Sequence, residues 1–109
     1  MTPVRTGRRL LVLAALAGCC LFPETATLII RNDSRFDVDE VYIAPVGSPD
    51  MGENWLPAAT TIPPGTSHIF RRVNPGTYDV LIYDTKGGIW PRSGLELPPG
   101  EKTTLTIID

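Results

Sequence analysis

The sequence has few of the residues that enzymes and disulfide-stabilised domains use. Its 109 residues include one histidine, His68, and two cysteines, Cys19 and Cys20, which are adjacent near the N-terminus. No pair of histidines or cysteines has metal-ligand spacing, and no glycine-rich phosphate loop is present. Nucleophilic catalysis also needs a nearby base, but His68 and Ser67 are neighbours in an expected strand and point to opposite faces. These absences predict a non-catalytic protein without a cofactor.

An excess of positive charge and a long apolar run are also absent. The chain has 10 basic and 12 acidic residues, and a form that lacks Arg5, Arg8 and Arg9 keeps 7 against 12. Such a surface lacks the basic footprint of nucleic-acid binding, so we expect no nucleic-acid partner. The apolar segment from Leu10 to Phe22 is shorter than the ~20 residues that a transmembrane helix needs.

The N-terminus instead has the order of a secretory signal peptide. A short apolar run from Leu10 to Ala17 follows the three arginines and ends in small residues. Its last four residues, Leu16-Ala17-Gly18-Cys19, resemble the lipobox of bacterial lipoproteins. That resemblance implies cleavage before Cys19, a diacylglycerol on its thiol and a fatty acid on its new amino group. We therefore expect a signal peptide over residues 1–18, a lipidated tether over 19–25 and one domain over 26–109.

This interpretation predicts a protein of the cell envelope, held at the membrane through its N-terminal lipid. No aspartate follows Cys19, which under the sorting rule for lipoproteins favours the outer membrane in a Gram-negative source. The alternative is ordinary secretion, since Ala15-Leu16-Ala17 also fits the A-x-A cleavage pattern and would release a soluble protein beginning at Gly18.

Residues 26–109 carry the pattern of an all-β domain. Turns rich in proline and glycine separate short β-branched and aromatic segments, and no apolar period of 3.6 residues occurs. We predict a small antiparallel β-sandwich of about seven strands, immunoglobulin-like or related. Strands are expected over 26–31, 39–44, 66–73, 77–84 and 103–108, with a broken segment over 89–97 after a hairpin turn at 84–88. The expected core residues are Val41, Ile43, Ile69, Val80, Ile82, Leu105 and Ile107.

Several of these segments resemble a group of uncharacterised exported bacterial β-sandwich proteins. The segments that carry the resemblance are Ile29-Ile30-Arg31-Asn32, Val41-Tyr42-Ile43-Ala44-Pro45, Asn54-Trp55-Leu56, Pro64-Gly65 and Gly76-Thr77-Tyr78-Asp79-Val80. The chain departs from the pattern after Trp55, where Leu56-Pro57 replaces an expected glycine. The resemblance implies the fold and no particular activity.

The long loop over 45–60 is the first candidate for a binding surface. It contains Met51, Trp55 and Leu56, and a tryptophan combines a large apolar area with a hydrogen-bond donor. Trp90, before Pro91, is the second candidate. In the alternative interpretation both indoles pack onto the sandwich and add to its small core.

These features favour a non-catalytic binding or structural module that contacts another envelope protein. One alternative is a carbohydrate- or peptidoglycan-binding module with Trp55, Trp90 and tyrosines as stacking platforms. Another is an accessory subunit of an envelope enzyme or transport complex.

Acidic residues gather in two turns. Asp33, Asp37, Asp39 and Glu40 surround the first turn, and Asp50 and Glu53 lie in the long loop. Their spacing matches no calcium loop, so we expect solvated carboxylates with ordinary pKa values and no metal site, with a weak cation site as the alternative.

Replacing Cys19 with alanine tests the lipid anchor. The variant should remain unprocessed or soluble, because Cys20 lies one residue beyond the cleavage position. Detergent partitioning and the mass of the mature protein measure the outcome. A Cys19→Ala variant that partitions into detergent with the mature mass would refute the assignment.

Overall fold

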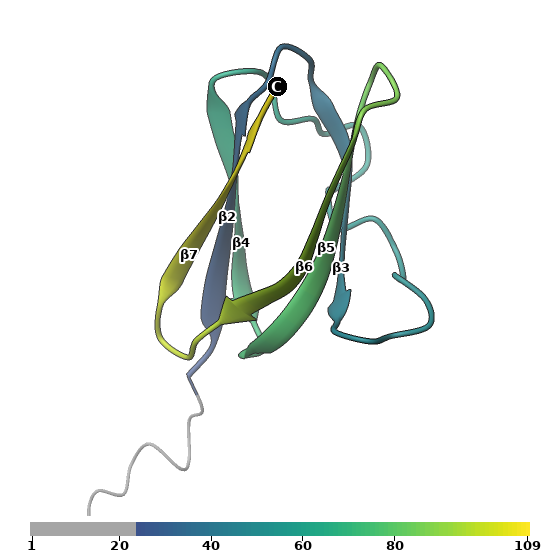
Figure 1. The fold of residues 1–109 in the computed structure, drawn as a ribbon. Coiled ribbons are helices and arrows are strands. Elements are labelled where there is room, and N and C mark those ends of the chain that lie inside the picture. The colour runs from purple at the N-terminus through teal and green to yellow at the C-terminus, as the bar shows by residue number, and fades with distance from the viewer. Residues whose placement is uncertain (1–23) are drawn as a thin grey trace, which may run out of the picture.

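The computed structural model describes residues 24–109, which form two facing three-stranded sheets (Figure 1). One sheet has the order β4-β2-β7 and the other the order β3-β5-β6. The strands are β2 (Ala26–Asp33), β3 (Val38–Pro45), β4 (Thr66–Val73), β5 (Gly76–Asp84), β6 (Ile89–Leu97) and β7 (Lys102–Ile108). Neighbouring strands are antiparallel, except that β2 and β7 are parallel. The predicted all-β sandwich is therefore confirmed.

The described part contains six strands where about seven were expected. It has no helix long and apolar enough to cross a bilayer. The predicted signal peptide and the predicted lipidation site at Cys19 lie outside the described residues.

The core lies between the two sheets and follows the alternation of the sequence. In β3, Val41 and Ile43 are buried, while Tyr42 between them is half-buried on the outer face. Val80 and Ile82 of β5 are buried on the same inner face. Leu105 and Ile107 of β7 are also buried, so six of the seven predicted core residues are confirmed. Successive side chains of a strand point to opposite faces, and this fixes which residues can share the core.

The prediction for Ile69 is wrong, because its side chain is 43% exposed. The pairing of β4 with β2 places Ile69 opposite Ile29 and Phe70 opposite Leu28. Directly paired residues share one face of a sheet, and Leu28 is fully buried. Phe70 therefore faces the core and Ile69 faces outward. Both faces of this segment carry apolar residues, so alternation alone did not distinguish them.

Asn32, at the end of β2, is a buried polar residue whose side chain is fully hydrogen-bonded. Its Nδ2 donates to the carbonyl oxygens of Phe36, at 2.8 Å, and Ile62, at 2.7 Å. Its Oδ1 accepts from the amide of Ser34, at 2.9 Å, and from the Ser34 hydroxyl, at 2.6 Å. Two donors and two lone pairs are the whole capacity of an amide side chain. Asn32 therefore joins the end of β2 both to the following turn and to the segment before β4.

Replacing Ile82 with alanine tests the architecture. Ile82 is fully buried, so the variant should lose roughly 2–5 kcal/mol of unfolding free energy through lost burial and the cavity left behind. Ile69→Ala is the matched control on the outer face and should cost less than about 1 kcal/mol. Urea unfolding followed by circular dichroism measures both. Equal losses would contradict the assignment of the two faces.

Candidate functional site

One lateral opening of the sandwich, beside β3, is closed by the segment over residues 46–65. Ile62 and Val38 exchange two backbone hydrogen bonds, of 3.0 and 2.8 Å. Farther along β3, the amide of Trp55 donates to the Val41 carbonyl at 2.7 Å, and Asn54 Oδ1 accepts from the Val41 amide at 2.9 Å. These bonds satisfy backbone groups that an edge strand otherwise leaves exposed.

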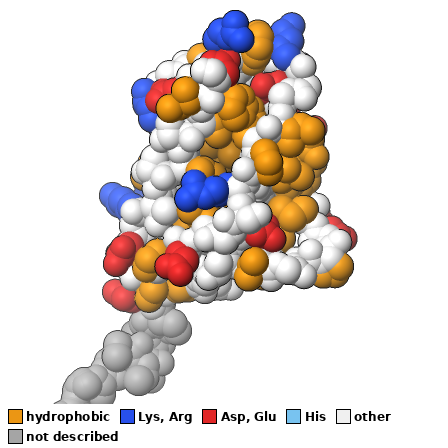
Figure 2. Space-filling view, viewed as in Figure 1, with side chains coloured by type: hydrophobic (Ala, Val, Ile, Leu, Met, Phe, Trp, Pro, Cys, Tyr) orange, Lys and Arg blue, Asp and Glu red, His pale blue; other side chains and the backbone are white. Residues whose placement is uncertain are grey.

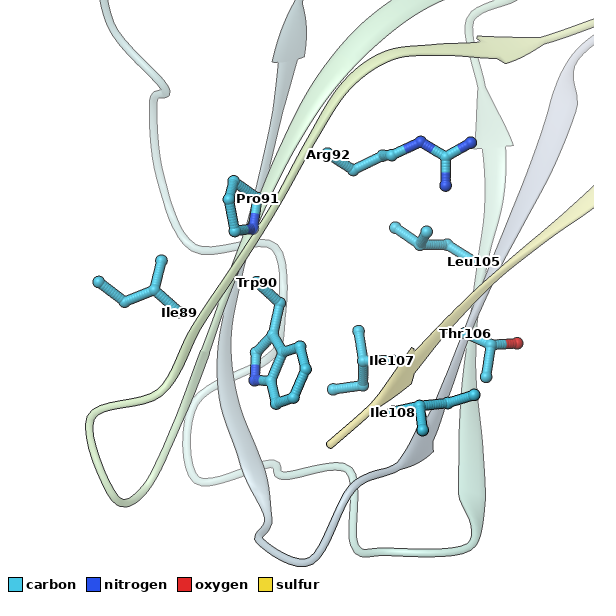
Figure 3. A pocket seen from close by; sticks show the side chains of 8 residues that line it. All are labelled: Ile89, Trp90, Pro91, Arg92, Leu105, Thr106, Ile107 and Ile108. Carbon is cyan, nitrogen blue, oxygen red and sulfur yellow. The ribbon is translucent and has the colours of Figure 1, made fainter.

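The opposite opening, between β6 and β7, contains a groove of about 320 Å³. No strand pairing joins β6 to β7 in residues 24–109. Figure 2 shows apolar side chains gathered in the hollow between the sheets, with a basic side chain among them. The groove is lined by Ile89, Trp90, Pro91 and Arg92 from β6 and by Leu105, Thr106, Ile107 and Ile108 from β7 (Figure 3).

The walls of the groove are mainly apolar. The side chains of Trp90 and Ile107 point toward each other across it (Figure 3), and the half-buried indole packs against the core. Ile89 and Ile108, at the rim of the groove, are 55% and 65% exposed. An exposed apolar surface around an opening is typical of a site of interaction.

A rigid hairpin turn positions the β6 wall, and the predicted turn at 84–88 is confirmed. Asp84 Oδ1 accepts from the amides of Lys86, at 2.8 Å, and Gly88, at 2.7 Å. Gly87 has a φ of 86°, a backbone conformation that glycine adopts without strain. A Cβ at position 88 would collide with the Asp84 carboxylate, so this close approach also needs glycine. The turn thereby sets where Trp90 enters the groove and where Ile89 lies at its rim.

The same turn lowers the pKa of the Asp84 carboxyl. Hydrogen bonds from the Gly88 amide, and then from the Lys86 amide, hold the pKa of the Asp84 carboxyl below its ordinary value, although burial opposes them. The pKa of Asp84 is thus lowered because the carboxylate folds back onto its own turn. Trp90 Nε1 is buried without a partner at hydrogen-bonding geometry, yet it approaches Asp84 closely enough to favour the ionised carboxylate.

The β7 wall is held at its C-terminal end by an ion pair. Asp109 Oδ2 accepts from Nε of Arg35, at 2.9 Å, and from the Arg35 amide, at 3.1 Å. The hydrogen bonds from Arg35 hold the pKa of the Asp109 carboxyl below its ordinary value. This contact keeps the end of β7 against the turn that Asn32 organises.

Arg92 is the single charged residue of the groove lining. Its side chain extends from β6 toward Leu105 of β7 (Figure 3). Among residues 24–109 the ion pairs are Arg31 with Asp33 and Arg35 with Asp109, so Arg92 has no acidic partner there. The groove therefore combines apolar walls with one uncompensated positive charge.

The structure does not bring the four predicted binding residues together. Leu56 is buried in the core, and Trp55 is 38% exposed with its ring edge-on to Phe70 at 6.0 Å. Trp90 lines the groove on the opposite side of the sandwich. Sequence reasoning did not identify Arg92 or the β7 residues as part of a site. The uncharged run over 103–108 was the feature of the sequence that could have indicated the β7 residues.

Met51 lies at a separate shallow pocket of about 280 Å³ on the outer face of β3 and β5. Its lining also includes Tyr42 and Tyr83, whose rings meet edge-on at 5.9 Å. The Tyr42 hydroxyl donates to Glu40 at 2.6 Å, and this hydrogen bond raises the pKa of Tyr42. Two polar groups of this pocket, those of Tyr42 and Glu40, thus bond to each other.

The expected acidic clusters do not converge on one point. No group of three or more His, Cys, Asp or Glu side chains in residues 24–109 is arranged to hold a metal ion. The ring of His68 packs against Phe70 at 4.7 Å, inside β4.

Comparison with known proteins supports the fold alone. The chain matches no protein-family model, and no curated protein is significantly similar to it. A solution structure of a protein from Eubacterium rectale is similar, with a TM-score of 0.55 and 18% identity. The similarity covers 87% of this chain and 84% of that one, so it spans nearly the whole sandwich.

The pKa of Asp84 predicts how stability depends on pH. A carboxyl whose pKa is lower in the folded state stabilises the fold above its unfolded pKa, about 3.9, and that contribution is lost as the pH falls through the folded pKa. Asp84→Asn should therefore lower the unfolding free energy at pH 7. It should also reduce the amount of unfolding free energy that is lost between pH 5 and pH 2, roughly the range over which such a group titrates. Urea unfolding across this range measures both. Asp50→Asn, in an exposed turn, is the control, and an identical pH profile for Asp84→Asn and the parent would contradict this role.

Proposed function

We propose that this protein is a lipid-anchored, non-catalytic module of the cell envelope that binds another protein through the groove between β6 and β7. The observation that carries the proposal is the asymmetry of the sandwich. The opening beside β3 is closed by a segment of the chain itself, whereas the opening between β6 and β7 presents apolar side chains and an unpaired arginine. An open groove with one charge suits a protein segment better than a small molecule, which needs an enclosing pocket.

The orientation of the domain agrees with this proposal. β7 is parallel to β2, and Ile108 lies opposite Asp33, at the end of β2 far from Ala26 (Figure 1). Ile89, Ile107 and Ile108 thus lie away from the end where the chain enters the domain. Six residues separate Cys19 from Ala26, and an extended chain spans at most about 3.6 Å per residue. A lipid on Cys19 would then hold the start of the domain within about 25 Å of the membrane, with these three isoleucines at the far end.

The positions of the aromatic residues weigh against the carbohydrate alternative. Trp55 lies near β3 and β4, and Trp90 lies between β6 and β7, so the two indoles do not form one stacking platform. The other alternative, an accessory subunit of an envelope enzyme or transport complex, would also require a surface for contact with another protein. We further propose that the sandwich is immunoglobulin-like or related, supported by its two facing sheets of three strands each.

Photo-crosslinking in the native host tests the proposal. Benzoylphenylalanine replaces Ile89 at the rim of the groove or Val46 far from it, and both positions are 55% exposed. Adducts with an envelope protein should form from position 89 and not from position 46. Arg92→Glu should reduce the yield at position 89. No adduct at position 89, or equal adducts at both positions, would overturn the proposed function.

A further inference from the structure

The backbone of β7 has a free edge whose direction follows from its pairing with β2. Thr27 lies opposite Lys102, and its amide donates to the Glu101 carbonyl at 3.0 Å. In a parallel pair this bond means that odd-numbered β7 residues direct their backbone groups toward β2. The amides and carbonyls of Thr104, Thr106 and Ile108 therefore point away from the sheet, on the side of β7 that faces the groove.

Nothing in the composition of β7 protects this edge. Residues 103–108 are three threonines, two isoleucines and a leucine, without proline, glycine or charge. Proteins usually block an exposed edge with charges, prolines, bulges or a covering segment. A short, uncharged run with high β-propensity on an open edge pairs readily with another strand.

The facing edge of β6, by contrast, is blocked. The amide of Asp84 donates to the Gly88 carbonyl, and Ile82 and Val80 lie opposite Trp90 and Arg92. This alternation directs the backbone of residue 91 away from β5, and Pro91 has no amide hydrogen to offer there. A register shift between Tyr78 and Val80 also interrupts the β5–β6 pairing. Of the two strands that border the groove, β7 alone is suited to accept a partner strand.

We infer that an extended segment of the partner protein adds to β7 as a fourth strand of the β4-β2-β7 sheet. This inference rests on the proposed function and specifies how the groove binds. Backbone hydrogen bonds to Thr104, Thr106 and Ile108 hold the segment, and its inward side chains contact Trp90 and Ile107. A carboxylate of the segment pairs with Arg92. A second copy of β7 does not fit as well, because residues 102–108 contain no carboxylate to meet that arginine.

Amide NMR of the full chain in detergent tests the inference. The probe is a nine-residue peptide that alternates valine and threonine and has a central glutamate. Its binding should shift the amides of Thr104, Thr106 and Ile108 and slow their hydrogen exchange. The same peptide with a central lysine should bind more weakly, and Arg92→Gln should abolish that preference.

Two variants at one position separate strand addition from other binding in the groove. Thr106→Pro removes an outward amide without touching the pairing with β2 and should weaken binding about tenfold or more, as the loss of one hydrogen bond does. Thr106→Val keeps the amide and should bind like the parent. If Thr106→Pro fails to fold, a probe methylated on alternate amide nitrogens provides the same test and should not bind.

Three outcomes would overturn the inference. The first is the absence of any shift at millimolar peptide. The second is binding in the groove that Thr106→Pro and amide methylation leave unchanged, which refutes strand addition while the proposed function stands. The third is protection of the β7 amides in a dimer without peptide, which makes a second copy the occupant. Failure of the crosslinking experiment would instead refute the proposed function itself.

Discussion

The buried side chain of Asn32 is the interaction on which the closure of the sandwich depends. It bonds to the turn after β2 and to the carbonyl of Ile62, and Ile62 in turn pairs with Val38 of β3. A buried amide is stabilising when all its donors and acceptors have partners and costly when one lacks a partner. The four bonds of Asn32 therefore tie the two sheets together at one end and direct the following loop along the edge of β3.

The two lateral openings of the sandwich differ in whether their strand edges are covered. A strand edge exposes polar backbone groups, and beside β3 the chain covers them with Asn54, Trp55 and Ile62. Beside β6 it places Pro91 where an amide would point outward. Of the two strands that border the groove, β7 keeps an uncovered edge, next to exposed Ile108 and Arg92. The proposed binding site thus includes uncovered backbone groups, unlike the covered edge of β3.

Much of the fold follows from local pattern. The alternation in β3, β5 and β7 predicted Val41, Ile82 and Leu105 as core residues, and the turn at 84–88 was recognisable from its two glycines. The pattern failed at Ile69, where both faces of the segment are apolar and only the pairing with Leu28 and Ile29 decides. The site was anticipated only through Trp90. Met51, Trp55 and Leu56 lie within six residues of the sequence, yet they occupy a surface pocket, a strand edge and the core, respectively.

The sequence by itself determined the class of the domain, its strands and most of its core, because alternation and turn chemistry act over a few residues. It also contained the lipobox-like motif on which the proposed anchoring rests. The tertiary structure alone decided that β7 lies parallel to β2 and faces β6 across a groove. Strand pairing joins residues that are far apart in the chain. The alternation of apolar and polar residues predicts which face of the sheet a side chain lies on, but it does not predict which strand is the neighbour. Whether an edge is open or covered is therefore a property of the assembled sheets.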